Sequence, residues 1–208
     1  MKPLYAILFF IAGTMMIAVL NAYELPLLAL MLISSGTILA LDRWRNLRCF
    51  FISVLVGGAC EAICVMLGVW KYSMQNYFLL PLWVPIAWGM AMVLFEEAFT
   101  KNVESPRFQK KAVAMSFGGA LLTGFASASE FSALFSFVVV TLILVVSGFY
   151  KRSELKAGVM AGLFGAGMEV VCIAAGGWHY PVAIFNAPIW LPLAWFNAFL
   201  IMRRVVPR

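Results

Sequence analysis

Long apolar stretches separated by short polar clusters make up nearly the whole chain. Charged and turn residues divide it into stretches of about 20 residues, the length that an α-helix needs to cross a bilayer core of roughly 30 Å. These stretches are continuously apolar and do not alternate over about ten residues, as transmembrane strands do. The pattern predicts an all-α polytopic membrane protein with eight transmembrane helices, at approximately 4–22, 25–41, 50–69, 79–98, 112–128, 131–149, 158–177 and 186–202.

The composition favours the same class of protein. Of the 208 residues, 64% are hydrophobic and 12% are charged, and the mean hydropathy is +0.97. An ordinary soluble domain is about 45–50% apolar and about 25% charged. These values exclude a soluble enzyme, a secreted disulfide scaffold and a disordered chain. Lys2 and the apolar run after it resemble a signal peptide, but no Ala-x-Ala type of pattern ends the run, so we expect this segment to be retained.

Basic residues fall almost entirely on one side of the predicted topology. Fourteen of the fifteen Lys and Arg lie at the termini or in the even-numbered connections, and Lys71 is the exception. The positive-inside rule therefore predicts a multi-pass cell membrane protein with both termini cytoplasmic. This topology and contact with anionic lipids account for the pI of about 9.3, so we expect no nucleic-acid partner.

The two halves of the sequence repeat one another. A shift of 108 residues places 57–72 over 165–180. Six residues of the first stretch meet an identical residue of the second: Gly57, Glu61, Cys64, Gly68, Trp70 and Tyr72. After a gap of one residue, PLWVPIAW at 81–88 lies over PIWLPLAW at 188–195.

This repeat predicts the organisation of the chain. We expect two tandem four-helix repeats, residues 1–104 and 105–208, that form one membrane domain. Because each repeat holds an even number of helices, both enter the membrane in the same direction. They should therefore be parallel and related by a pseudo-twofold axis along the membrane normal.

Glu61 and Glu169 are the only acidic residues in the middle of predicted spans. Ionisable groups that face lipid are costly, so both side chains are expected to point into the bundle. A carboxyl group in such an apolar setting is expected to keep its proton. A rise of about 1.5 Å per residue puts Trp88 level with Glu61, and Trp195 level with Glu169, while Trp70 lies roughly 13 Å above Glu61. Indole N–H groups are donors, so we predict hydrogen bonds between Glu61 and Trp88 and between Glu169 and Trp195.

Together these positions predict an outward-opening cavity with at least one protonated glutamic acid. The candidate catalytic residues are Glu61, Glu169, Trp88 and Trp195. Pro85 and Pro192 are expected to expose backbone carbonyls one turn above these tryptophans, because a proline in mid-helix leaves the carbonyl four residues before it unpaired. Six aromatic residues at the outer edge are candidates for substrate binding: Trp70, Tyr72, Trp83, Trp178, Tyr180 and Trp190.

Structural explanations of the same residues remain open. The two glutamates could form interhelical hydrogen bonds that hold the halves of the bundle together. The outer tryptophans could be an aromatic belt at the lipid interface. Glu96 and Glu97 are expected to be solvated charges, and His179, which corresponds to Lys71, an exposed polar residue. The four cysteines have no CxxC spacing, and we expect no metal or other cofactor.

The repeated pattern resembles spans of the bacterial and archaeal carotenoid-biosynthesis membrane protein family. In both 61–88 and 169–195 it consists of Glu, then Gly-x-Trp-x-Tyr, then Pro-x-Trp-x-Pro-x-Ala-Trp. Members of that family are polytopic and include hydratases that add water to the ends of long isoprenoids. The resemblance implies a membrane lyase or cyclase for an isoprenoid, with Glu61 and Glu169 as its acids.

The residues themselves favour similar chemistry. A neutral acid beside aromatic rings suits protonation of an alkene, because the ring faces stabilise a developing carbocation. The first hypothesis is therefore an integral membrane enzyme that acts on a hydrophobic lipid or isoprenoid by acid-assisted hydration, cyclisation or isomerisation. One alternative is a transporter or proton-linked permease. The other is a non-catalytic subunit of a membrane complex with unidentified membrane-protein partners.

Overall fold

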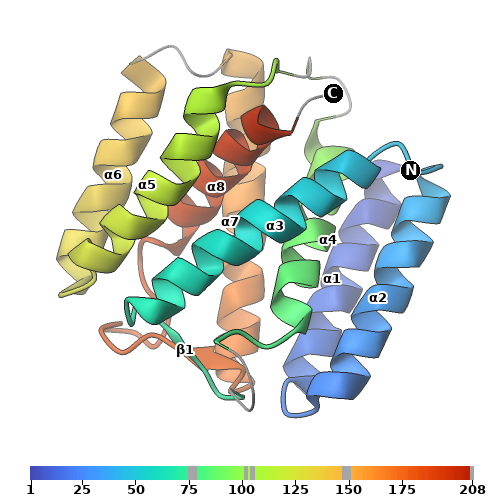
Figure 1. Ribbon diagram of the computed structural model, residues 1–208, viewed down its shortest axis with the longest axis horizontal. Helices are drawn as coiled ribbons and strands as arrows, with labels where there is room; N and C mark the ends of the chain where they lie inside the picture. The colour runs from blue at the N-terminus through green and yellow to red at the C-terminus, as the bar shows by residue number, and fades with distance from the viewer. Residues whose placement is uncertain (75–78, 101–102, 104–105, 147–150, 207–208) are drawn as a thin grey trace.

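The computed structural model describes residues 1–74, 79–100, 103, 106–146 and 151–206. Within these residues the fold is all-helical apart from one pair of two-residue strands, β1 and β2 (Figure 1). All eight predicted helices are present. The elements are α1 (Pro3–Leu20), α2 (Glu24–Leu41), α3 (Leu47–Met66), β1 (Lys71–Tyr72), α4 (Trp83–Phe99), α5 (Lys110–Ala126), α6 (Glu130–Val146), α7 (Arg152–Ala174), β2 (Trp178–His179) and α8 (Leu191–Val205).

Some predicted positions lie outside the described residues. They are the end of the predicted helix at 131–149, the repeat boundary at 104 and 105, and the basic residues Lys101 and Arg208.

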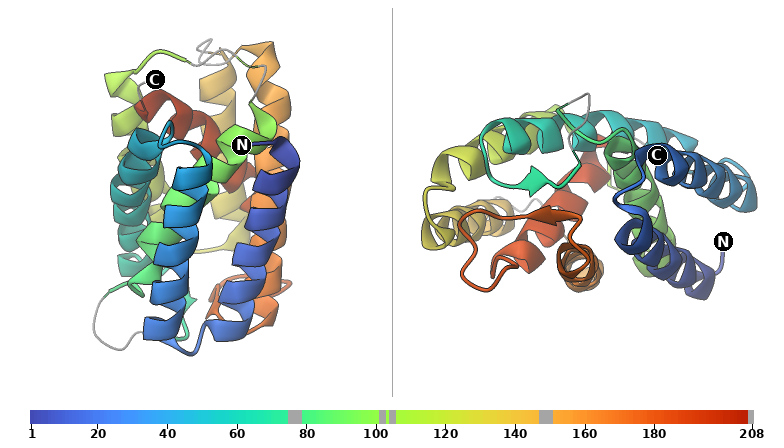
Figure 2. Two further views of the ribbon diagram at one scale, coloured as in Figure 1. Left: turned by 90° about the vertical axis from the view of Figure 1, so that its right-hand side faces the viewer. Right: turned by 90° about the horizontal axis from the view of Figure 1, so that it is seen from below.

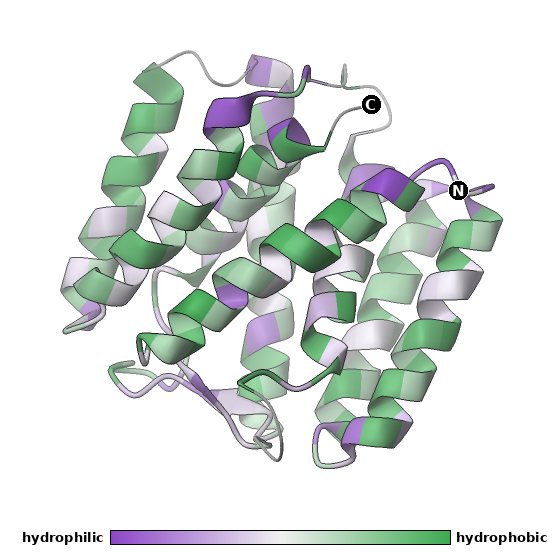
Figure 3. Ribbon diagram, viewed as in Figure 1, coloured by the Kyte–Doolittle hydropathy of each residue, from purple (hydrophilic) through white to green (hydrophobic). Residues whose placement is uncertain are grey.

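The outer surface of the fold is strongly apolar. Four helices, α1, α2, α3 and α7, are long and apolar enough to cross a membrane by length and composition. The other four have 15 to 17 residues. Large side chains project outward, including Phe125 (76% exposed), Phe131 (67%) and Val146 (84%), and hydrophobic residues cover the outer helices in Figure 3. Such a surface is typical of membrane association.

The two ends of the helix bundle differ in composition. Both chain termini lie toward one end, which we call the basic end because it also holds the ion pairs of Arg203 and Arg204 (Figures 1 and 2). The opposite end, which we call the strand end, holds β1 and β2 (Figure 1). The strands pair antiparallel, with Lys71 opposite His179 and Tyr72 opposite Trp178. The strand end therefore joins residues from both halves of the sequence.

Contacts between helices occur in corresponding pairs. α3 packs on α4 as α7 packs on α8, and α1 packs on α4 as α5 packs on α8. Across the halves, α1 contacts α7 as α5 contacts α3. The thiols of Cys64 and Cys172 both approach a backbone oxygen on these neighbouring helices, that of Ala120 and that of Thr14 respectively. Equivalent positions are therefore 106 residues apart on α1 and α5, compared with 108 on α3 and α7.

Helices α3 and α7 end earlier than predicted. Their last residues are Met66 and Ala174, whereas the sequence pattern continued to 69 and 177. Gly68 and Gly176 have positive φ angles of 75° and 78° and follow each helix in a Schellman motif. In α3 this motif is closed by hydrogen bonds from the N–H of Gly68 to the oxygen of Val65 and from Val69 to Cys64. These two repeated glycines terminate helices and do not belong to a packing face.

Helices α4 and α8 begin later than predicted. They start at Trp83 and Leu191, so Pro85 and Pro192 lie in the first turn. The first four N–H groups of a helix have no intrahelical partner, and a proline there removes no helical hydrogen bond. The prediction that these prolines expose carbonyls in mid-helix is therefore wrong.

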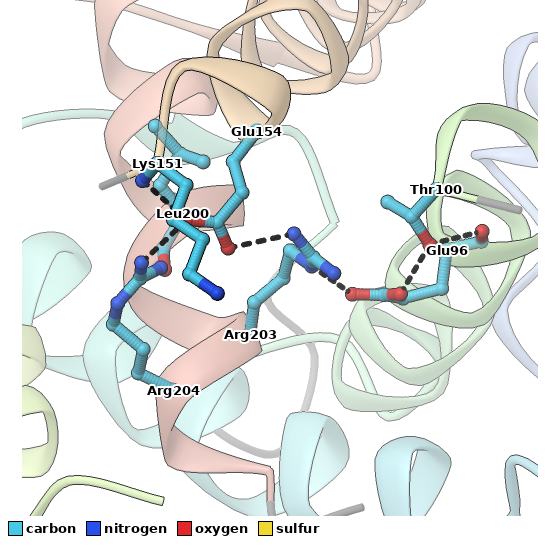
Figure 4. A network of polar contacts seen from close by, with 7 residues as sticks. All are labelled: Glu96, Thr100, Lys151, Glu154, Leu200, Arg203 and Arg204. Atoms are coloured by element: carbon cyan, nitrogen blue, oxygen red, sulfur yellow. Dashed lines mark hydrogen bonds and ion pairs between the residues drawn. The ribbon is translucent and has the colours of Figure 1, made fainter. Parts of the chain in front are cut away.

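Charged groups at the basic end form a buried network, shown in Figure 4. The guanidinium of Arg203 donates to Glu96 at 2.7 Å and to Glu154 at 2.8 Å, and Arg204 donates to Glu154 at 2.6 Å. Glu96, Glu154, Arg203 and Arg204 are each at most 5% exposed. The network joins α4, α7 and α8, and the prediction that Glu96 is solvated is wrong.

Glu97 is also engaged in contacts at this end. Its carboxylate accepts a hydrogen bond of 2.7 Å from the side-chain amide of Asn46. The side chain of Glu97 is 15% exposed. The expectation of a solvated Glu97 is wrong as well, because the loop before α3 covers it.

Candidate functional site

Glu61 is the centre of a hydrogen-bond network in the first half of the chain. Its Oε1 accepts hydrogen bonds from the indole N–H of Trp70 at 2.8 Å and from the hydroxyl of Tyr72. Its Oε2 accepts one from the indole N–H of Trp88 at 2.9 Å. Glu61 is 6% exposed. One buried carboxyl group therefore holds three aromatic donors from three segments, namely the loop after α3, β1 and α4.

Glu169 has the same environment in the second half. Its Oε2 accepts hydrogen bonds from Trp178 at 2.8 Å and Tyr180 at 2.9 Å, and its Oε1 from Trp195 at 3.1 Å. The predicted pairs of Glu61 with Trp88 and of Glu169 with Trp195 are thus confirmed. Buried polar groups are costly unless they are hydrogen-bonded, and both glutamates are satisfied by protein donors.

Chain reversals after α3 and α7 bring the other donors to the glutamates. After Gly68 the backbone turns back into β1, so the Trp70 indole reaches Glu61 directly. The predicted distance of roughly 13 Å assumed that the helix continued to Trp70, and is wrong because α3 ends at Met66. Trp178 and Tyr180 reach Glu169 in the same way.

The outer tryptophans do not form a belt facing lipid. Trp83 is 3% exposed, Trp178 is 6% and Trp190 is 2%, and only Trp70 is partly exposed. Within the fold, Trp83 packs edge-on against Tyr72 and Trp190 against Tyr180. These side chains extend the aromatic layer around the glutamates.

Aromatic rings from the two halves meet between the glutamates. Trp88 and Trp195, at equivalent positions, stack with ring centroids 5.0 Å apart at 21°. Trp70 contacts Tyr180 at 5.5 Å. The equivalent contact, between Tyr72 and Trp178, has the same centroid distance of 5.5 Å.

Two cavities adjoin this layer, whereas the sequence predicted one. The larger, of about 150 Å³, is lined by α3, α5, α6 and α8, and we call it the α5–α8 cavity. The smaller, of about 70 Å³, is lined mainly by α1, α2, α4 and α7, and we call it the α1–α4 cavity. Four residues line both cavities: Glu61, Glu169, Trp88 and Trp195. The predicted binding residues are divided, with Trp70, Tyr180 and Trp190 at the larger cavity and Tyr72, Trp83 and Trp178 at the smaller.

Repeated glycines allow the tryptophans to reach the glutamates. A Cβ atom at Gly57 would lie 2.8 Å from Cγ and Cδ2 of Trp88, and one at Gly165 would overlap the same atoms of Trp195. We expect Gly165→Ala to displace the Trp195 indole and lower the free energy of unfolding by about 1–3 kcal/mol. Unfolding in mixed detergent micelles would measure this. Gly167→Ala is the matched control on the same helix, since a Cβ there meets nothing within 4 Å. Equal stability of the two variants would contradict this account.

A second repeated acidic pair was missed in the sequence. Glu24 accepts a hydrogen bond of 2.8 Å from the backbone N–H of Leu82, and Glu130 accepts one of 2.6 Å from that of Ile189. Both begin a helix and hold the segment that enters α4 or α8. They are 106 residues apart and do not align under the shift of 108. An alignment of α2 with α6 alone, at a shift of 106 residues, places these two glutamates opposite each other.

Lys71 and His179 are exposed and lie opposite each other in the strand pair. The prediction that His179 is an exposed polar residue is confirmed. In the described part of the chain, no group of three or more His, Cys, Asp or Glu side chains is placed to hold a metal ion.

Comparisons with known proteins gave no match, so a function for this chain has to be argued from the geometry of the two glutamates and their cavities. No protein-family model, curated protein or solved structure matches this chain.

Proposed function

We propose that all eight helices cross the membrane as two parallel four-helix repeats, with the basic end in the cytoplasm. The corresponding helix contacts support a pseudo-twofold axis, and fourteen of the fifteen basic residues support the orientation. The shorter α4 and α8 start below the strand end, and the described residues 79–82 and 180–190 precede them within the remaining depth. Non-helical backbone is tolerated at such depth where protein covers it, and Glu24 and Glu130 satisfy part of this backbone.

Within this fold, we propose an integral membrane enzyme that acts on a hydrophobic lipid or isoprenoid by acid-assisted hydration, cyclisation or isomerisation. The observation that carries this proposal is the duplicated network, in which two glutamates, each held by two tryptophans and one tyrosine, line apolar cavities. Intramembrane acids are costly and are by default functional. Aromatic rings beside an acid stabilise positive charge that develops on a protonated substrate.

The chemistry requires one glutamate to carry a proton. The O–H bond of the acid breaks and its proton forms a C–H bond at one alkene carbon, which leaves positive charge on the other. In hydration, the oxygen of a water molecule bonds to that cationic carbon and the excess proton passes to a carboxylate, so the acid is regenerated. Loss of a proton from a neighbouring carbon to the carboxylate gives isomerisation instead. In cyclisation, a second double bond forms a C–C bond to the cationic carbon, the positive charge moves to the far carbon of that double bond, and loss of a proton from its neighbour to the carboxylate completes the reaction. Trp88 and Trp195 orient the two carboxyl groups through their N–H bonds.

Deuterium transfer to lipid carbon tests this proposal. Membranes with the protein, incubated in D₂O, should accumulate carbon-bound deuterium in an isoprenoid or lipid that membranes without it do not label. We expect Glu61→Gln and Glu169→Gln each to lower the rate at least about 100-fold. Glu24→Gln is the matched control, because it changes a repeated acid outside both cavities. Unchanged labelling and unchanged cellular lipid extracts in both cavity variants would refute the enzyme.

One observation favours a proton-linked carrier as the second candidate. The same two glutamates line both cavities, together with the stacked Trp88 and Trp195, so each acid can exchange a proton with either binding compartment. A carrier must also open at the basic end, where the buried ion pairs close the fold. Substrate uptake into proteoliposomes driven by a pH gradient, without deuterium in lipid carbon, would select the carrier.

A further inference from the structure

The two cavities are built from equivalent positions. α1 and α5 contribute residues 106 apart, and α4 and α8 contribute residues 107 apart. Gly13 in the α1–α4 cavity corresponds to Gly119 in the α5–α8 cavity, and Ala87 corresponds to Ala194. The side chains that differ between the cavities can therefore be compared one by one.

At three of these positions the α1–α4 cavity has a large apolar side chain and the α5–α8 cavity a polar one. Phe10 corresponds to Ser116, Ile17 to Thr123, and Met90 to Asn197. Phe10 fills its position by packing on Phe95, with ring centroids 4.9 Å apart. The polar counterparts are smaller or similar in size, and the α5–α8 cavity is about 150 Å³ against about 70 Å³.

Several groups in the α5–α8 cavity retain hydrogen-bonding capacity. Asn197 is 3% exposed; its carbonyl oxygen accepts from Thr141 and its amide donates to the backbone oxygen of Phe137. A carboxamide has two N–H donors, so a second one is left within the described part of the chain. Trp190 is 2% exposed, and its indole N–H has no acceptor among the described residues. A buried donor without an acceptor costs about 1–3 kcal/mol, which a ligand oxygen would recover.

Trp83, the counterpart of Trp190, also has a buried N–H without an acceptor among the described residues. The unpaired indole therefore does not distinguish the cavities. The difference lies in the groups around it, because the α1–α4 cavity has Met90 where the other has an amide.

Charge and volume define the class of ligand. The described residues that line the α5–α8 cavity include Glu61 and Glu169 but no Lys, Arg or His, so a phosphate or carboxylate would be unpaired there. The N–H donors of Asn197 and Trp190 suit an uncharged oxygen instead. The hydroxyls of Ser116 and Thr123 already donate to backbone oxygens, and their lone pairs can accept from an alcohol O–H. Cavities of about 150 Å³ take up a molecule of the size of benzene. The space therefore fits one end of a chain, not a whole lipid.

We infer that the α5–α8 cavity binds the end of a long apolar molecule that carries one uncharged oxygen group, an alcohol or a carbonyl, and that the α1–α4 cavity does not. The inference rests on the proposed function only in taking the ligand to be a lipid. The α1–α4 cavity is the counterpart whose space Phe10, Ile17 and Met90 occupy.

Photolabelling of the purified protein in nanodiscs tests this inference. The probe is a farnesol analogue with a diazirine on the first isoprene unit, and the labelled peptides are identified by mass spectrometry. Label is expected on α5, α6 or α8. Farnesol should compete at least about tenfold better than farnesene or farnesoate, since a lost hydrogen bond of about 1.4 kcal/mol is a factor of ten.

Variants that copy the smaller cavity make the test specific. Ser116→Phe and Asn197→Met each place the residue of the α1–α4 cavity at its equivalent position, and each should lower labelling at least about tenfold. Thr123→Ile is the third variant, for use if either of these does not elute as a folded species. Met90→Leu is the matched control in the α1–α4 cavity, with unchanged labelling expected.

Three results would overturn the inference: label on α1 or α4, equal competition by farnesene, or full labelling of the folded Ser116→Phe variant. Labelling needs no turnover, so its outcome is independent of the enzyme. If farnesol labels α5–α8 but no lipid takes up deuterium, the enzyme is refuted and the binding site stands. If deuterium uptake persists in a folded Ser116→Phe variant that has lost labelling, the enzyme and the binding site both stand, and the reaction takes place outside the α5–α8 cavity.

Discussion

Glu154→Ala is expected to lower the free energy of unfolding by about 3–5 kcal/mol, the usual cost of removing one partner of a buried ion pair. The carboxylate of Glu154 accepts hydrogen bonds from Arg203 and Arg204, and both arginine residues are only 3% exposed (Figure 4). Without Glu154 these two cations stay buried and lose a shared counter-charge. The same carboxylate also accepts from the backbone N–H of Lys151 at the start of α7, so the helix terminus loses a bond too.

Equilibrium unfolding in mixed detergent micelles measures this effect. Arg152→Ala is the matched control, since Arg152 is exposed two residues away on the same helix, and we expect a change within about 0.5 kcal/mol. A Glu154→Ala variant as stable as Arg152→Ala would mean that water solvates the network and that the basic end is open.

The ion pair of Arg203 with Glu96 joins the two halves of the chain at equivalent positions, 107 residues apart. In two identical repeats, a twofold axis would bring Glu against Glu or Arg against Arg at this point. Like charges in contact are unfavourable, and the opposite charges here bind the halves in a single arrangement. Residues that are identical in the two repeats could not predict this ion pair. The pair exists because the repeats have different residues, Glu96 and Arg203, at equivalent positions.

The number and type of helices were predictable because each helix is a long apolar stretch between polar clusters. The positions of Glu61 and Trp88 were also predictable, since both lie within regular helices where the rise per residue applies. Trp70 was misplaced because apolar residues continue past the end of α3. Gly68 ends the helix there through a local backbone conformation with positive φ, and hydropathy carries no signal of it.

The cavities were predictable only in part. The sequence indicated an apolar site with two acids, and both acids line it. It did not indicate two cavities, because the alignment under one shift compared α3 with α7 but left Phe10 and Ser116 out of register. The loops that join the helices differ in length between the halves, so each helix pair has its own shift.

Trp195→Ala is expected to be the most disruptive single change in the aromatic layer, with a loss of about 3–5 kcal/mol in the free energy of unfolding. Trp195 is 6% exposed, stacks on Trp88, packs edge-on against Phe95 and donates to Glu169. It also lines both cavities, so truncation to alanine would add empty space to each of them. A cavity that cannot collapse accounts for most of the expected cost.

Trp195→Phe separates the stability that comes from the packing of the aromatic ring from the stability that comes from the indole N–H donor. Phenylalanine keeps an aromatic ring beside Trp88 but leaves one oxygen of Glu169 without its hydrogen bond, which we expect to cost about 1–3 kcal/mol. Trp44→Ala is the control, because Trp44 is 54% exposed, with an expected change within about 0.5 kcal/mol. The same micelle titration ranks the three variants. If Trp195→Ala and Trp195→Phe are equally unstable, the hydrogen bond to Glu169 and not the packing of the indole accounts for the contribution of Trp195 to stability.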